Sequence, residues 1–459
     1  MGKSIKVRLT IMSFLQFFVW GAWLITIANY WFTTKQWDKV AFGAVFSTLG
    51  FSSLFMPAIT GIIADKWVNA ERLYGILHFL GGITLCFIPL AGNTNEFFWI
   101  ILLAMVCYMP TISLSNTIGY HVLKNNDYDV VKVFPPIRVW GTIGFIAAMW
   151  FVNLTGNKAS YNQFIIAGIA GILLGIYSFT LPKCPPQLGK SEKKSLIEAF
   201  GLNAFKLFLN YKTALFFLFS MMLGAALQLT NMFGDVYVSE FGYFGKYQGS
   251  LIVEKSTIVM SISQVSETLF ILAIPFFLKR FGIKKVMLIS MLAWVLRFGL
   301  LAYGNPADGL WMIIASCIVY GMAFDFFNVS GSLYLETTVN YKIRASAQGL
   351  FMMMTNGFGA VIGSLASAAI IQRFFTLKFE TTSSLTEYLG IKESNPVFAN
   401  LTQYVKISPD GKFSNAITLF DWSPIWLSFA AYALVIAILF AIFFKHKHNP
   451  EELSEKISH

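Results

Sequence analysis

Long apolar stretches alternate with short polar connections along almost the whole chain. An α-helix needs about 20 mostly apolar residues to cross the hydrocarbon core of a bilayer. Hydrophobic windows of roughly this length or more fall at 9–32, 40–64, 73–92, 97–120, 133–154, 162–181, 213–235, 251–278, 285–304, 309–334, 344–371 and 423–444. The pattern predicts an all-α membrane protein with twelve transmembrane helices.

A long basic connection at 182–212 divides the twelve stretches into two sets of six, and the two sets echo each other. A Gly-Ala pair precedes an asparagine in the first stretch (Gly21, Asn29) and again in the seventh (Gly224, Asn231). Small residues let membrane helices approach closely. Such residues recur in the fifth and eleventh stretches, at Gly141, Gly144, Gly357, Gly359 and Gly363.

The repeat indicates two pseudo-symmetric six-helix bundles. Repeats of this kind are typical of transporters, which bind their substrate near the membrane midplane between the two halves. We expect an N-terminal bundle at 1–181, a cytoplasmic linker at 182–212, a C-terminal bundle at 213–445 and a cytoplasmic tail at 446–459. The C-terminal bundle would include a long outer loop at 372–421.

Charge sets the expected orientation. Only 12% of the residues are charged, and the formal net charge is +11. Lysine and arginine concentrate in the alternate connections that lie on the side of both termini, for example at 182–212 and 279–285. Basic loops favour the cytoplasm, so we expect both termini on the cytoplasmic side of the membrane, and no nucleic-acid partner. No cleavable signal is expected, and the four cysteines, at Cys86, Cys107, Cys184 and Cys317, are expected to be packing residues.

In four of the stretches, several polar side chains at membrane depth share one face of the predicted helix. An ionisable group in hydrocarbon costs a few kcal/mol, so such residues usually face a cavity and have a function there. Residues three, four or seven apart share one face of a helix. The groups that share a face are Arg138, Thr142 and Phe145 in the fifth stretch, Gln228 and Asn231 in the seventh, Gln264 and Glu267 in the eighth, and Tyr320, Phe324, Asp325 and Asn328 in the tenth.

These side chains suit a ligand that is flat at one end and rich in hydroxyls at the other. Amides offer a donor and an acceptor together, so they can read the edge of a nucleobase, and aromatic rings can stack on its face. Glu267 and Asp325 could accept hydrogen bonds from ribose hydroxyls. A nucleotide is disfavoured, because the sequence has no glycine-rich phosphate loop and no cluster of buried cations.

Each residue also has a purely structural interpretation. Amides in transmembrane helices commonly join neighbouring helices, and isolated aromatic residues are common in the core. Four amides stay undecided between pocket and packing: Gln16, Asn116, Gln348 and Asn356. We expect Arg297 to pair locally or to extend toward the interface, outside the site.

Two sets of motifs resemble known families. The turn Gly61-Ile-Ile-Ala-Asp65-Lys66, with a basic echo between the eighth and ninth stretches, resembles the major facilitator superfamily. Longer motifs resemble bacterial nucleoside permeases of the nucleoside:proton symporter family. They are Phe134-Pro-Pro-Ile-Arg-Val-Trp-Gly-Thr-Ile-Gly-Phe145, Leu227-Gln-Leu-Thr-Asn-Met-Phe-Gly234, Ile262-Ser-Gln-Val-Ser-Glu-Thr-Leu-Phe-Ile271, Tyr320-Gly-Met-Ala-Phe-Asp-Phe-Phe-Asn328 and Ile343-Arg-Ala-Ser-Ala-Gln-Gly349.

The resemblance implies a carrier that takes a nucleoside inward together with a proton. The pocket residues it implies are Arg138, Thr142, Phe145, Gln228, Asn231, Gln264, Glu267, Tyr320, Phe324 and Asp325. Asp325 is the first candidate for the proton site and Glu267 the second, because Arg138 could keep one carboxylate charged. We expect a monomer that needs no cofactor or metal. The loop at 372–421 departs from the family by its length.

Other functions stay open on the sequence alone. Sugar carriers also use amide and aromatic contacts, and an uncoupled nucleoside facilitator would have a similar pocket. An enzyme is disfavoured, because no nucleophile has an adjacent base and no histidine pair lies at membrane depth. The five histidines are His78, His121, His446, His448 and His459.

Overall fold

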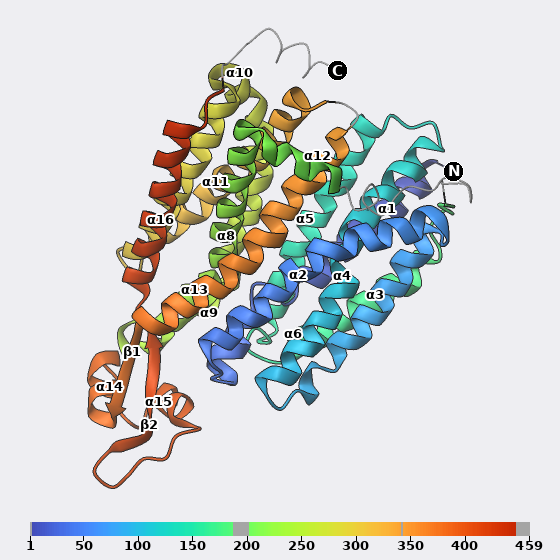
Figure 1. The fold of residues 1–459 in the computed structure, drawn as a ribbon. Helices are drawn as coiled ribbons and strands as arrows, with labels where there is room; N and C mark the ends of the chain where they lie inside the picture. The colour runs from blue at the N-terminus through green and yellow to red at the C-terminus, as the bar shows by residue number, and fades with distance from the viewer. Residues whose placement is uncertain (1, 187–201, 341–342, 447–459) are drawn as a thin grey trace.

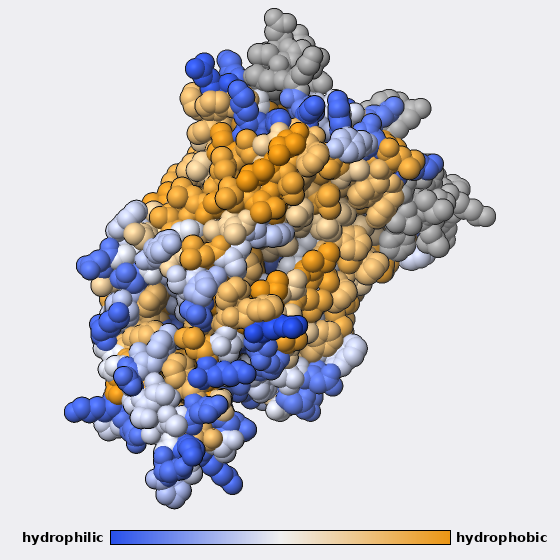
Figure 2. Space-filling view, turned by 60° about the vertical axis from the view of Figure 1, so that its left-hand side comes forward, coloured by the Kyte–Doolittle hydropathy of each residue, from blue (hydrophilic) through white to orange (hydrophobic). Residues whose placement is uncertain are grey.

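The computed structural model describes residues 2–186, 202–340 and 343–446. The predicted positions in 187–201, at 342 and in most of the 446–459 tail therefore lie outside the described residues. Within the described residues the chain is a long helical body with a small mixed subdomain at one end (Figure 1). Hydrophobic side chains cover much of the body, and hydrophilic side chains gather at its two ends (Figure 2).

The N-terminal half begins with α1 (Gly2–Gly21), which continues through a short turn region into the π-helix η1 (Asn29–Thr34). Five longer helices follow: α2 (Lys39–Lys66), α3 (Ala70–Cys86), α4 (Thr94–Lys124), α5 (Val130–Leu154) and α6 (Asn162–Ser178). A short helix, η2 (Ile88–Leu90), lies between α3 and α4.

The C-terminal half begins with η3 (Leu202–Leu209) and α8 (Tyr211–Glu240). The short helices η4 (Phe241–Tyr243), η5 (Gly245–Tyr247) and α9 (Leu251–Glu254) lead to α10 (Ser256–Tyr303) and α11 (Leu310–Thr338). The next membrane segment consists of α12 (Arg344–Met352), the π-helix η7 (Met353–Gly359) and α13 (Ala360–Phe374), and the last is α16 (Trp422–Phe443).

The described residues contain nine helices long and apolar enough to cross a membrane. One of them, α10, holds two spans that meet at Gly282, whose φ of 76° is not helical. With α1–η1 and the shorter α6, these segments account for the twelve predicted spans. The predicted all-α membrane fold is thus confirmed.

Two details of the predicted spans were wrong. The first span is not one helix over 9–32, because residues 22–26 form turns in which backbone N–H groups bond at mixed spacings, such as Trp23 to Trp20. The eighth span does not begin at 251, because α9 ends at Glu254 and Lys255 separates it from α10. In both places local backbone hydrogen bonding overrides the apolar pattern.

Glycines hold equivalent helix pairs together in the two halves. A Cβ on Gly144 of α5 would lie 2.1 Å from the Phe14 carbonyl oxygen of α1, and one on Gly21 would lie 2.4 Å from the Phe145 carbonyl oxygen. In the C-terminal half, a Cβ on Gly224 of α8 would lie 2.1 Å from the Thr355 carbonyl oxygen. The predicted close packing of the glycine-bearing helices is therefore present in both halves.

The two halves also touch through glycines of α2 and its partner segment. A Cβ on Gly43 would lie 2.6 Å from the Ser364 carbonyl oxygen, and one on Gly50 would lie 2.7 Å from the Gly357 carbonyl oxygen. The motif Gly61–Lys66 occupies the last turn of α2, so it belongs to a helix end and not to a loop.

The loop at 372–421 folds into a small subdomain instead of remaining irregular. The strands β1 (Thr376–Thr381) and β2 (Lys412–Phe420) pair antiparallel, and α14 (Thr382–Leu389) and α15 (Pro396–Thr402) lie between them in sequence. Its core includes Phe379, Leu385 and Phe398. Gln36 donates to the Asn400 carbonyl at 2.7 Å, and Tyr404 donates to the Thr34 carbonyl at 3.2 Å, so the subdomain also contacts the N-terminal half.

Filling a glycine contact should destabilise the fold. Gly144→Ala should lower the free energy of unfolding by about 1–3 kcal/mol, because the added Cβ forces α1 and α5 apart. Gly299→Ala is the matched control, because no atom lies within 4 Å of its Cβ position. That change should shift stability by less than about 1 kcal/mol. Thermal unfolding in detergent measures both, and equal stability of the two variants would contradict the packing argument.

Candidate functional site

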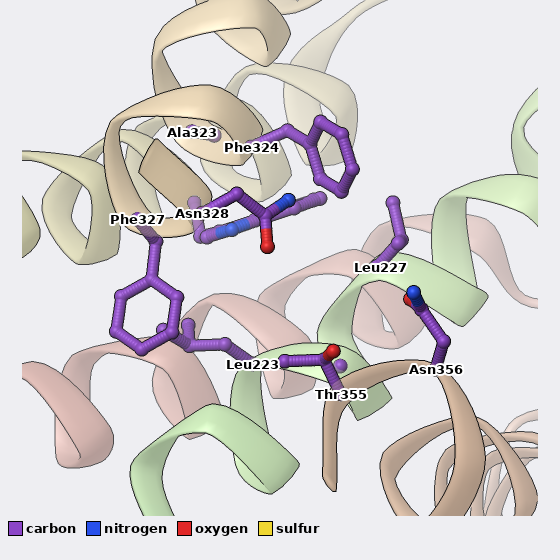
Figure 3. Close-up of a pocket in the computed structure, with 10 residues that line it drawn as sticks. Leu223, Leu227, Ala323, Phe324, Phe327, Asn328, Thr355 and Asn356 are labelled. Carbon is purple, nitrogen blue, oxygen red and sulfur yellow. The ribbon is translucent and has the colours of Figure 1, made fainter. Parts of the chain in front are cut away.

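Two cavities lie at the centre of the described helices. The first, which we call the aromatic cavity, encloses about 290 Å³. Its walls come from the C-terminal half and consist of Leu223, Gly224, Leu227, Trp294, Ala323, Phe324, Phe327, Asn328, Thr355 and Asn356. Phe324, Phe327 and Asn328 extend from α11, and Thr355 and Asn356 approach from η7 on the opposite side (Figure 3). This cavity offers flat apolar walls with a few amide and hydroxyl groups.

The second, which we call the polar cavity, encloses about 260 Å³ and has walls from both halves. Ile25 and Met149 contribute from the N-terminal half. The C-terminal half contributes Thr230, Asn231, Met260, Ser263, Gln264, Arg297 and Tyr320. The polar cavity therefore brings amide, hydroxyl and guanidinium groups together with apolar side chains of the N-terminal half.

Aromatic rings separate the two cavities. Tyr320 and Phe324 stack with ring centroids 5.9 Å apart and planes inclined by 4°. Trp294 meets Tyr320 edge-on at 6.0 Å. Since Tyr320 lines the polar cavity and Trp294 and Phe324 line the aromatic one, the cavities are neighbours.

Four of the ten predicted pocket residues line these cavities. Asn231, Gln264 and Tyr320 face the polar cavity, and Phe324 faces the aromatic one. Gln228 is buried one residue after Leu227, and its Oε1 has no hydrogen-bond partner. The remaining five, Arg138, Thr142, Phe145, Glu267 and Asp325, are not among the residues that line either cavity.

The two predicted carboxylates, Glu267 and Asp325, lie on two helices that pack closely together, α10 and α11. Gly321 brings α11 so close to α10 that a Cβ on it would lie 2.7 Å from the Glu267 backbone nitrogen. Asp325 follows one turn later, is 4% exposed, and has an Oδ2 without a hydrogen-bond partner. The two carboxyl groups are close enough for their charges to interact. A pair of acidic groups is thus held inside the protein.

Arg138 approaches this acidic pair from the other half. Its guanidinium lies 3.9 Å from the centre of the Phe17 ring, over a gap that Gly141 leaves open. Its charge interacts with that of Glu267. On the same helix Phe145 is buried and meets Trp20 edge-on at 6.4 Å. Arg138 and Phe145 of α5 therefore both contact aromatic rings of α1.

Sequence reasoning missed Arg297. Its pairing crosses between helices, because Nη1 of Arg297 on α10 donates to the Ser316 carbonyl of α11 at 2.6 Å. Arg297 is fully buried, lines the polar cavity, and lies 4.6 Å from the centre of the Tyr320 ring. The sequence did contain a signal for this role, because Arg297 carries a permanent charge within an otherwise apolar stretch.

The undecided amides divide between the two interpretations. Gln16 accepts from Tyr74 at 2.7 Å and donates to Thr111 at 2.9 Å, and Gln348 donates to the Ser332 carbonyl at 2.8 Å, so both are packing residues. Asn356 instead lines the aromatic cavity. Asn116 is partly buried and lines neither cavity.

The two halves are tied together at the end that carries the subdomain. Asn29 of the N-terminal half donates to the Asp235 carboxylate of α8. Lys158, in the connection between α5 and α6, donates to Ser256 Oγ at 2.9 Å, Ser239 Oγ at 3.1 Å and the Val253 carbonyl at 3.2 Å. Burial lowers the pKa of the Lys158 ammonium, and the negative charge of Asp235 opposes that shift. These contacts join the N-terminal and C-terminal halves at the subdomain end.

The described part of the chain contains no group of three or more His, Cys, Asp or Glu side chains that could hold a metal ion. Cys107, Cys184 and Cys317 are buried and Cys86 is partly buried, and all four have free thiols. What the site offers is a set of donors, acceptors, aromatic faces and ionisable carboxyls, which is suited to binding a solute and a proton.

Comparison with known proteins identifies the family. Residues 3–449 match the family described as "Nucleoside H+ symporter". The chain is 45% identical to nucleoside permease NupG of Escherichia coli (strain K12) over 446 residues, which cover 97% of each chain. It is 44% identical to the xanthosine permease of the same organism over 457 residues, which cover 99% of each chain.

Solved structures agree with this assignment. The crystal structure of the nucleoside transporter NupG superposes with a TM-score of 0.82 at 44% identity, over 96% of this chain and all of that one. A bacterial homologue of the lysosomal transporter Spinster gives a TM-score of 0.64 at 13% identity, which shows a shared fold alone. The major facilitator fold and a transporter rather than an enzyme are therefore established, and the chain belongs to the nucleoside H+ symporter family.

Proposed function

We propose that this protein imports nucleosides together with protons by alternating access. The observation that carries the proposal is the placement of a buried carboxyl group, Asp325, and a partly buried one, Glu267, on helices that also line cavities with amides and aromatic rings. In this proposal both termini are cytoplasmic, the membrane is the bacterial inner membrane, and the subdomain at 376–420 is outside. The transporting unit is a monomer, and the bundles at 1–181 and 213–445 move about the linker at 182–212.

The substrate would lie across the two cavities. Stacking on Phe324 and Tyr320 suits the flat base, because aromatic contacts hold nucleobases without strict sequence or base selection. The amides of Gln228, Asn231 and Gln264 supply donors and acceptors for polar edges. The names of two relatives, a nucleoside permease and a xanthosine permease, support a nucleoside as the substrate.

The proton would be carried by the acidic pair. A charge in a site that excludes water is costly, and protonation of a carboxyl group removes that charge. Asp325 is the first candidate, because Glu267 has the guanidinium of Arg138 as a counter-charge. Loading a proton from outside and releasing it inside would then couple the gradient to the movement of the two halves.

In this proposal, the described conformation is a state of the transport cycle in which the substrate site is closed to the outside. The contacts of Asn29 and Lys158 with the C-terminal half lie at the end proposed to be outer. Opening to the outside requires these contacts to break while the halves rotate about the bound solute.

Removal of the proposed proton site should uncouple transport. Asp325→Asn should abolish accumulation of labelled uridine in proteoliposomes with an inward proton gradient, because the amide cannot take up and release a proton. Exchange of uridine across the membrane without a gradient should remain measurable. Asp308→Asn, at an exposed position outside the helices, is the control and should accumulate uridine normally. Full accumulation by Asp325→Asn would remove this residue from coupling.

Loss of an amide should weaken nucleoside binding. Gln228→Ala or Asn231→Ala should each cost about 1–3 kcal/mol of binding free energy, because a polar group of the bound nucleoside would lose its partner. Gln348→Ala is the control, since this amide bonds within the protein and lies outside both cavities. Calorimetry on purified protein measures the affinities. Competition by free ribose as strong as that by uridine would instead favour a sugar carrier.

Weakening the closed end should increase exposure of the polar cavity from outside. Lys158→Met removes an ammonium with several hydrogen bonds to the other half, so it should increase the outward-open population. The readout is the reaction rate of Ile25→Cys with an impermeant thiol reagent, in a background without the native cysteines. Lys392→Met, on the exposed face of the subdomain, should leave that rate unchanged. An unchanged rate in Lys158→Met would show that this network does not hold the end closed.

A further inference from the structure

The polar cavity contains three buried polar atoms without a hydrogen-bond partner. They are Arg297 Nη2, Gln264 Oε1 and Ser263 Oγ. A buried donor or acceptor that lacks a partner costs about 1–3 kcal/mol, so proteins rarely gather such atoms in one place without a ligand to pair with them. The convergence of an unpaired donor, an unpaired acceptor and a hydroxyl in one cavity indicates a binding subsite.

Arg297 has only one part of its guanidinium left for a ligand. Nη1 is bonded to the Ser316 carbonyl at 2.6 Å, Nε lies 3.5 Å from Thr230 Oγ1, and the Tyr320 ring covers the face. None of the ion pairs formed by the described residues involves Arg297. A guanidinium can donate but never accept, and the Cys317 sulfur beside Arg297 and Ser263 is only a weak acceptor. Nη2 is therefore able to donate to a stronger acceptor on whatever occupies the cavity.

We propose that Arg297 contacts the substrate and reads the base, an inference that rests on the proposed function. Nη2 donates to a carbonyl oxygen of the base, and Gln264 Oε1 accepts from the ring N–H beside that carbonyl. The recognised chemistry is a lactam edge, in which an N–H adjoins a C=O. Uracil, hypoxanthine and guanine carry this edge. Adenine carries the reverse arrangement, with a ring nitrogen acceptor beside an amino donor.

The two protein groups contribute unequally to this selectivity. The amide of Gln264 can turn by half a rotation and exchange its donor for its acceptor, so it adapts to either edge. Arg297 cannot adapt, because all its polar hydrogens are donors. The preference for a carbonyl therefore depends on Arg297, and Tyr320 fixes the plane of the guanidinium.

Inosine and adenosine form a matched pair for the test, since they differ at the edge in question and share the ribose. The experiment measures the dissociation constants of both nucleosides by calorimetry on full-length protein in detergent, after thermal unfolding has shown that each variant is folded. Wild-type protein should bind inosine more tightly. Arg297→Gln should weaken inosine binding by about tenfold and change adenosine binding much less, so the ratio of the two constants should fall. Arg297→Lys, which keeps the charge and a donor, should recover part of the preference.

A second variant keeps the proposal testable if Arg297→Gln does not fold. Gln264→Glu leaves only acceptors at that position when the carboxylate is charged, so it should raise the preference for inosine over adenosine. Equal loss of both nucleosides in Arg297→Gln, or an unchanged ratio, would overturn the proposal and assign the cavity to the ribose or Arg297 to structure alone. Wild-type protein that binds neither nucleoside would contradict the proposed function itself, which is a different result.

Discussion

The central constraint on this protein is that lipid offers no partner for a polar group. Carboxyls, amides and guanidinium groups on membrane helices must therefore meet inside the protein. Asp325 and Arg297 are buried, Glu267 and Arg138 are partly buried, and each of the four interacts with a residue of another helix. The cavities beside them exist because these groups are turned away from the hydrophobic surface.

The helical packing makes that arrangement possible. Glycines let α1 approach α5, and let α8 approach the η7–α13 segment, until backbones almost touch. Gly321 does the same for α10 and α11, which sets Glu267 close to Asp325. The same packing in both halves leaves a boundary between them where polar groups can gather. Contacts of Asn29 and Lys158 join the two halves at the end that carries the subdomain.

Spacing along single helices predicted part of the cavity lining, since four of the ten predicted residues line the two cavities. Gln264 and Glu267, or Tyr320 and Phe324, share a helix face by their separation alone, and the glycine pattern correctly indicated close packing. Arg297 could not be assigned in this way, because its partners Ser316 and Tyr320 belong to another helix. The same holds for Ser263 and Thr230, which are ordinary small polar residues until the fold places them around one cavity.

The amino-acid sequence by itself determined the number of spans, the two-part organisation and the family, because hydrophobic length and local motifs are properties of contiguous residues. Tertiary structure alone decided which polar groups face a shared cavity, how the first span is interrupted near Gly21, and that the loop at 372–421 folds around its own core. The physical reason is that cavities, unpaired atoms and subdomain cores arise from contacts between residues far apart in the chain, and hydrophobic periodicity carries no record of those contacts.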